Sequence, residues 1–124
     1  APAELAFPSY DGNGMFRSLG NVLVNPWVAL LFIDFENPKR LRVNGRASVS
    51  LEDPLLREFE GAQLIVRLRA ERIFPNCPRY IPRMQLLEAS PYVPRPGCEP
   101  PVPAWKKREV FNEVLPKGDP GRKL

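Results

Sequence analysis

The chain has 124 residues, of which 44% are hydrophobic, and a formal net charge of +4 with an isoelectric point near 9.4. This length accommodates one domain, and the hydrophobic content excludes disorder throughout. There is no histidine, which excludes a Ser-His-Asp triad and most catalytic zinc sites. The chain has two cysteines and shows no zinc motif, no apolar run of membrane-spanning length and no signal peptide. We therefore expect a cytoplasmic protein without metal, membrane anchor or disulfide framework.

The first third of the chain predicts a strand, a turn, a helix and a second strand. Residues 4–8 form a short apolar run, and the turn 11–14 is rich in residues that tolerate positive φ. A helix is expected over 16–24, ended by an Asn-Pro pair. Residues 27–35, WVALLFIDF, are apolar almost throughout, which predicts a strand buried on both faces. The apolar side of the helix is expected to consist of Phe16, Leu19 and Leu23, with Val22 beside them.

The middle of the chain predicts two longer strands around a brief helix. Residues 40–51 alternate between apolar and polar side chains, which is typical of a strand with one buried and one polar face. Residues 53–61 predict a brief helix, with Asp53 as its cap and Pro54 at its first position. Residues 62–74 predict a third long strand.

Nine of the sixteen prolines lie between residues 75 and 103, where they interrupt regular structure. Residues 85–90 could form one further strand or a short helix within this part. A Pro-rich tether is expected over 91–103, a helix over 104–115, and a mobile tail after it.

These elements predict a mainly β fold with short helices, a small antiparallel β-barrel. We expect residues 1–90 to form the barrel domain. Residues 91–124 would then be a Pro-rich segment and a C-terminal helix that packs on the barrel or on a partner subunit.

The stretch DGNGMFRS combines a glycine-rich turn with the start of a helix. Gly12 and Gly14 would let a ligand approach the backbone closely, and a helix N-terminus offers free N–H groups and a partial positive charge. Arg17 could bind a phosphate through two hydrogen bonds, and Ser18 could donate one more. A capped helix after an ordinary surface turn, with Arg17 in solvent, is the alternative.

Three arginines share the polar face of the strand at 40–51, namely Arg40, Arg42 and Arg46. They could form one wall of an anion site or a dimer contact. They could also be ordinary surface charges paired with carboxylates.

Two other residues are chemically suggestive but favour structural roles. Cys77 has no neighbouring base to activate it, so we expect a buried and inert thiol. Trp105 precedes the predicted C-terminal helix and is expected to be a packing anchor.

Three stretches, GNGMFRSLGNVLVNPWVALLFIDF, RLRVNGRASV and FPNCPRYI, together resemble the pyridoxamine 5′-phosphate oxidase-like family of FMN-binding split β-barrels. The similarity extends over about residues 5–80. The family pattern has a strand, an Asn-containing turn, a Ser-Arg-Lys triplet, a helix, Asn-Pro and a long apolar strand. On this resemblance Asn13 matches the turn, Arg17 matches the phosphate-binding arginine, and Ser18 stands at the lysine. Arg40 stands where the oxidases often have a flavin-contacting glutamine.

The resemblance implies an FMN-dependent oxidoreductase that acts as a homodimer on a small-molecule substrate. It implies FMN contacts from Gly12, Asn13, Gly14, Arg17, Ser18, Arg40 and Arg42. It also implies an upstream strand pair, which we expect to precede Ala1. The main alternative is a split barrel without catalysis that binds flavin, a deazaflavin or another phosphorylated ligand.

Nucleic-acid binding is a weaker alternative, because no aromatic side chains alternate with the arginines of residues 40–50. Haem binding, found in some split-barrel relatives, would need an axial ligand other than histidine.

Overall fold

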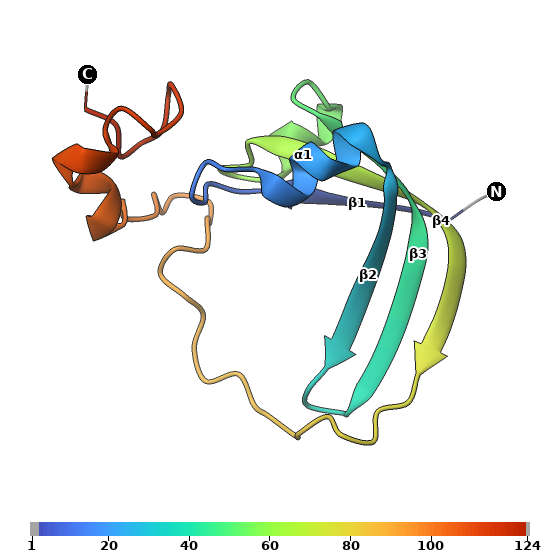
Figure 1. Ribbon diagram of the computed structural model, residues 1–124. Helices are drawn as coiled ribbons and strands as arrows, with labels where there is room; N and C mark the ends of the chain where they lie inside the picture. The colour runs from blue at the N-terminus through green and yellow to red at the C-terminus, as the bar shows by residue number, and fades with distance from the viewer. Residues whose placement is uncertain (1–2, 124) are drawn as a thin grey trace.

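The computed structural model describes residues 3–123 and contains a four-stranded antiparallel sheet in the order β1-β4-β3-β2. The sheet curls into a half-barrel, and one α-helix lies across one of its ends (Figure 1). This arrangement confirms the predicted class, mainly β and antiparallel with short helices. The elements are β1 (Glu4–Ser9), α1 (Arg17–Val24), β2 (Trp27–Asp34), β3 (Lys39–Ser50), the 3-10 helix η1 (Pro54–Glu58), β4 (Leu64–Asn76), η2 (Ala104–Lys107) and η3 (Glu109–Phe111).

The core lies between α1 and the proximal half of the sheet. Val22, predicted beside the apolar side of the helix, is buried, and Leu19 packs against the core. The prediction was wrong for Leu23, which is 75% exposed. Phe16 stands at the cap position with a left-handed backbone (φ 47°), and the helix begins at Arg17. The buried core residues are Val22, Val43, Ala47, Leu64, Val66 and Leu68.

Strand β3 follows the predicted alternation. Val43, Gly45 and Ala47 are buried on the core face, and the arginines of β3 alternate with them. A β-bulge falls between Asn44 and Gly45, where the register against β4 shifts by one residue.

Strand β2 differs from the prediction of burial on both faces. Within residues 3–123 it is the last strand of the sheet and pairs with β3 alone. Val28 and Leu30 are half-buried against the core, but Leu31, Phe32 and Ile33 are exposed. The apolar run therefore makes core contacts only along its near half, because the sheet extends beyond α1 (Figure 1).

The C-terminal part differs from the prediction in three ways. Residues 85–90 form neither strand nor helix. The predicted helix over 104–115 is replaced by η2 and η3, because Arg108 between them takes an extended conformation (φ −75°, ψ 134°). The predicted mobile tail folds back, and Asp119 is buried in it. We call residues 104–123 the C-terminal segment; they lie beside the loop between β1 and α1 (Figure 1).

Candidate functional site

The loop between β1 and α1 has a defined conformation at the predicted phosphate site. The Asn13 side-chain oxygen accepts a hydrogen bond from the Met15 N–H at 3.0 Å, which closes a small turn. Gly14 follows with a φ of 74°, a backbone that glycine adopts without strain. Phe16 also has a positive φ, a strained backbone that is unusual for a bulky residue.

The first turn of α1 presents backbone donors without a side-chain cap. Phe16 occupies the cap position and makes no side-chain hydrogen bond there. The N–H groups of this turn therefore stay available to an anion. Arg17 and Ser18 are exposed and line a cavity of about 260 Å³, together with Gly12, Asn13 and Gly14. The structure thus brings five of the seven predicted site residues to one place.

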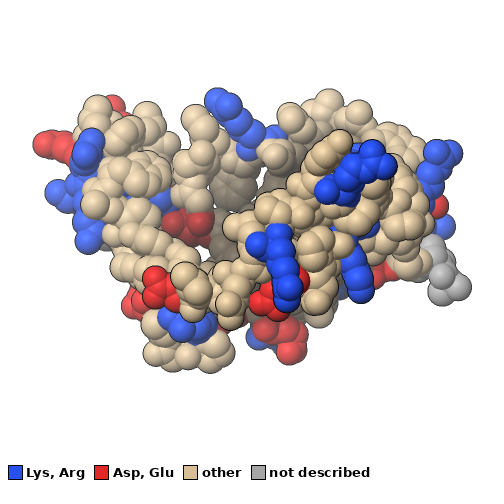
Figure 2. Space-filling view, turned by 90° about the horizontal axis from the view of Figure 1, so that it is seen from below, with Lys and Arg blue, Asp and Glu red and all other residues tan. Residues whose placement is uncertain are grey.

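A second, larger cavity of about 880 Å³ adjoins this one. It lies between the same loop and the Pro-rich residues 92–105, and Gly12 and Asn13 line both cavities. Tyr92 and Trp105 contribute aromatic walls. Figure 2 shows the surface hollowed between the two halves of the molecule, with mostly uncharged side chains around the hollow.

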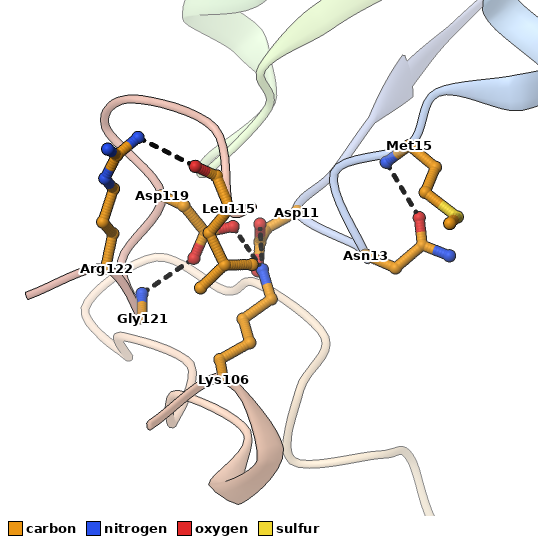
Figure 3. Close-up of polar contacts among 8 residues, drawn as sticks. All are labelled: Asp11, Asn13, Met15, Lys106, Leu115, Asp119, Gly121 and Arg122. Atoms are coloured by element: carbon orange, nitrogen blue, oxygen red, sulfur yellow. Dashed lines mark hydrogen bonds and ion pairs between the residues drawn. The ribbon is translucent and has the colours of Figure 1, made fainter. Parts of the chain in front are cut away.

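A buried ion cluster holds the C-terminal segment beside this loop (Figure 3). The Lys106 ammonium is only 1% exposed, and it donates to both carboxylate oxygens of Asp11 at 2.8 Å and to Asp119 at 2.6 Å. Burial works against the charged ammonium, but the hydrogen bonds and charges of the two carboxylates outweigh it, so the pKa of Lys106 is raised.

Arg40 and Arg42 lie elsewhere. Both belong to the first residues of β3, next to the β2–β3 turn, which is at the end of the sheet away from α1 (Figure 1). Arg40 donates to the Cys77 carbonyl oxygen, and Arg42 donates to the Asn76 side chain at 3.2 Å. Within one chain, the structure does not bring these arginines together with Arg17.

One polar atom on the arginine face lacks a partner. Asn44 lies on β3 between Arg42 and Arg46, and its side-chain oxygen is buried without a hydrogen bond from any residue that the structure describes. A buried acceptor of this kind costs free energy until a donor satisfies it. No described residue offsets this cost, and the Asn44 oxygen is too deeply buried to belong to a surface site.

Cys77 and Trp105 were both predicted to have structural roles. Cys77 is exposed rather than buried, because it lies just beyond the end of β4; it is a free cysteine, as is Cys98. Trp105 makes packing contacts but is also 36% exposed and lines the larger cavity, so its role as a packing anchor stays a prediction. Its ring meets that of Phe111 edge-on at 5.4 Å and lies 5.6 Å from the Lys106 ammonium.

Sequence reasoning missed the ion cluster and the strained Phe16. Lys106 stands in an ordinary basic triplet, and no local pattern marks it as buried. Asp119 lies in the GDPG stretch, whose glycines and prolines indicated a mobile tail. Asp11 belongs to the glycine-rich turn, and only its contact with a residue 95 positions away reveals its role.

The part of the chain that the structure describes contains no helix long and apolar enough to cross a membrane. The same residues contain no group of three or more cysteine or acidic side chains that could hold a metal ion.

The curled antiparallel sheet with one helix across its end places the chain among the mainly β half-barrel proteins. The family model "Pyridoxamine 5'-phosphate oxidase" matches residues 2–92, which is well over half of the chain. The chain therefore belongs to the pyridoxamine 5′-phosphate oxidase family, as the sequence resemblance indicated.

Among solved structures, the chain is similar to tagged HupZ of Group A Streptococcus, a 1.70 Å crystal structure. The TM-score is 0.46 and the sequence identity is 18%, over 58% of this chain and 62% of the HupZ chain. The chain thus spans less than two thirds of that relative. No curated protein sequence matches the chain.

Proposed function

We propose that this protein is a flavin-binding oxidoreductase that holds the phosphate of FMN at the N-terminus of α1. Family membership supports a flavin, and the uncapped first turn beside Arg17 and Ser18 supports a phosphate. The uncapped helix end is the observation that carries the proposal. A cavity of about 260 Å³ has room for a phosphate group but not for a whole flavin, so the ring would lie outside it.

In this proposal the chain binds and orients, and the cofactor carries the chemistry. A bound flavin would supply hydride and electron transfer. Gly12 and Asn13 would offer backbone to the ligand, while Arg17 would neutralise the phosphate charge. The absence of histidine fits this division, because flavin chemistry does not require a protein base.

We also propose that the working form is a homodimer. The distal half of the sheet exposes Phe32, Leu41 and Ile73 on the core face, beyond the cover that α1 provides. Apolar patches of this kind are typical of interfaces between subunits. A second copy could also bring its Arg40 and Arg42 to the phosphate site of the first, which one chain does not do alone.

The substitution Arg17→Ala tests the phosphate site. We expect FMN binding to weaken by about 1.5–3 kcal/mol, because a charged hydrogen bond to phosphate is lost. The measurement is an FMN titration followed by flavin fluorescence. Arg79→Ala is the matched control, since Arg79 is an exposed arginine in the linker after β4 and lines neither cavity at the β1–α1 loop. Equal affinity in the Arg17 and Arg79 variants would remove Arg17 from the site.

A split barrel that binds a flavin, a deazaflavin or another phosphorylated ligand without catalysis is the second candidate. Arg40 and Arg42 are separated from α1 within one chain. This separation favours the second candidate, because a single chain would then contact only the phosphate end of the ligand. Competition between FMN and a deazaflavin would decide the ligand. Reduction of bound FMN by a nicotinamide donor, faster than that of free FMN, would favour the oxidoreductase.

The cytoplasm is the proposed location. The free cysteines Cys77 and Cys98 suit a reducing compartment, where disulfides are rare.

A further inference from the structure

The C-terminal segment contacts both ends of the loop of residues 11–14. At the first end, Lys106 binds Asp11 through both carboxylate oxygens at 2.8 Å (Figure 3). At the other end, the Pro116 ring lies so close to Gly14 that an added Cβ would be 2.6 Å from it. A segment some hundred residues later in the sequence therefore contacts the loop that forms the proposed phosphate site.

The contact between the C-terminal segment and the loop depends on the buried charge of Lys106 rather than on a surface ion pair. Lys106 is 1% exposed and the Asp119 side chain is 2% exposed, so neither charge could be buried without the other. The Trp105 ring covers the ammonium on one side, and Gly121 leaves room for the lysine stem. Exposed pairs contribute little, whereas loss of one partner from a buried pair is costly.

The two carboxylates play different parts. Asp119 belongs to the C-terminal segment, so its bond to Lys106 holds that segment together. Asp11 belongs to the loop, so its bond to Lys106 joins the segment to the loop. A change at Asp11 can therefore undo the connection while leaving the pair inside the segment intact.

We propose that Asp11 and Lys106 form a latch through which the C-terminal segment holds residues 11–14 in the conformation that binds phosphate. Asp11 and Lys106 are positioning residues, and neither needs to touch the ligand. The inference rests on the proposed function, in which this loop belongs to the phosphate site. Because the coupling is reciprocal, a bound phosphate would also hold the C-terminal segment more firmly in place.

Electrostatics and positioning predict opposite results for Asp11→Asn. Removal of a negative charge beside an anion site strengthens anion binding if charge alone matters. Loss of the latch weakens binding, because the loop must then be ordered when the ligand arrives. The sign of the effect therefore separates the two explanations.

The experiment compares the full wild-type chain with Asp11→Asn and Glu60→Gln. Glu60 is exposed and lines the same large cavity, so its variant removes one negative charge without breaking the latch. FMN and inorganic phosphate are titrated by calorimetry. We expect Asp11→Asn to weaken the binding of both about tenfold, which is within the usual range for coupled sites, and Glu60→Gln to leave it unchanged or slightly tighter.

A second measurement follows the latch itself. Amide hydrogen exchange over residues 104–123 should be faster in Asp11→Asn than in the wild type, and FMN should slow it in the wild type. Unchanged or tighter ligand binding by Asp11→Asn, or unchanged exchange in that variant, would overturn the latch. A wild-type chain that binds neither FMN nor phosphate would overturn the proposed function and this inference with it.

Discussion

Gly45 lies where β3 and β4 come too close together for any side chain. An added Cβ would be 2.1 Å from the Arg69 carbonyl oxygen and 3.1 Å from the Ala70 α-carbon, and both of these are backbone atoms. The bulge at Asn44 and Gly45 produces this close approach. The glycine is therefore needed for the close approach of β3 and β4, because the neighbouring atoms belong to the backbone and cannot move aside as a flexible side chain could.

We expect Gly45→Ala to lower the free energy of unfolding by about 1–3 kcal/mol, because the two backbones must move apart. Urea unfolding followed by circular dichroism measures the change. Gly20→Ala is the control. Gly20 lies in α1 with nothing within 4 Å of an added Cβ. Its replacement should raise stability by up to about 1 kcal/mol. If both variants changed the free energy of unfolding in the same direction, the close backbone approach at Gly45 would not be the cause.

At the scale of elements, Arg67 joins three parts of the chain. It lies on β4 and binds the Asp53 carboxylate through two nitrogens, at 2.6 and 3.0 Å, and Glu4 of β1 at 2.5 Å. Asp53 also caps η1 by accepting from the Leu55 N–H. One arginine thus ties η1 and the first strand to β4.

These hydrogen bonds make part of the stability depend on pH. The Arg67 hydrogen bond, with help from Leu55, holds the pKa of Asp53 below its ordinary value of 3.8. The stabilisation is therefore fully present above that value and is lost as the pH falls through the lower, folded-state pKa.

We expect Asp53→Asn to be less stable than the wild type at pH 7, with the difference shrinking below about pH 4 as Asp53 becomes protonated. Urea unfolding between about pH 7 and about pH 2.5 measures this. Glu113→Gln, which removes an exposed carboxylate, serves as the control and should show no such convergence. A difference that is constant over this pH range would show that charge on Asp53 is not the cause.

At the scale of the whole molecule, the half-barrel leaves one end of its sheet uncovered. Phe32 pairs with Leu41 across β2 and β3, and Val43 beside Leu41 pairs with Ile73, so all four side chains share the core face. Val43 is buried under α1, but Phe32 is 48% exposed and Ile73 is 53% exposed. The core thus continues outward into a surface that a second subunit would cover.

We expect Phe32→Asp to weaken dimerisation at least tenfold, because it places a charge in the proposed interface and removes a large apolar side chain. Sedimentation velocity over a range of protein concentrations measures the change. Val110→Asp, which changes an exposed apolar residue on η3, should leave the dimer intact. A wild-type chain that is monomeric at all concentrations would remove the dimer from the proposal.

Much of the fold could be predicted from local patterns. The alternation of β3, the Asp53 cap and the Gly-rich turn before α1 each depend on neighbours in the sequence, and each is present as predicted. The C-terminal helix could not be excluded in this way. Two short 3-10 helices replace it, and the Lys106 side chain of the first is buried against Asp11, a residue distant in the sequence.

The candidate site shows the same division. Gly12, Asn13, Gly14, Arg17 and Ser18 are close in sequence, so their proximity followed from the turn and the helix that contains them. Arg40 and Arg42 are on the predicted face of β3, but their distance from α1 depends on where the helix crosses the sheet.

The sequence by itself determined the class of fold, the family and the glycine-rich turn that leads into α1, because each is encoded by spacing along a short stretch of chain. Only the tertiary structure decided that β2 is an exposed edge strand, that the arginines of β3 lie apart from Arg17, and that Lys106 is buried against Asp11 and Asp119. The physical reason is that burial and ion pairing depend on which distant segments meet, and those meetings are set by the packing of the whole sheet.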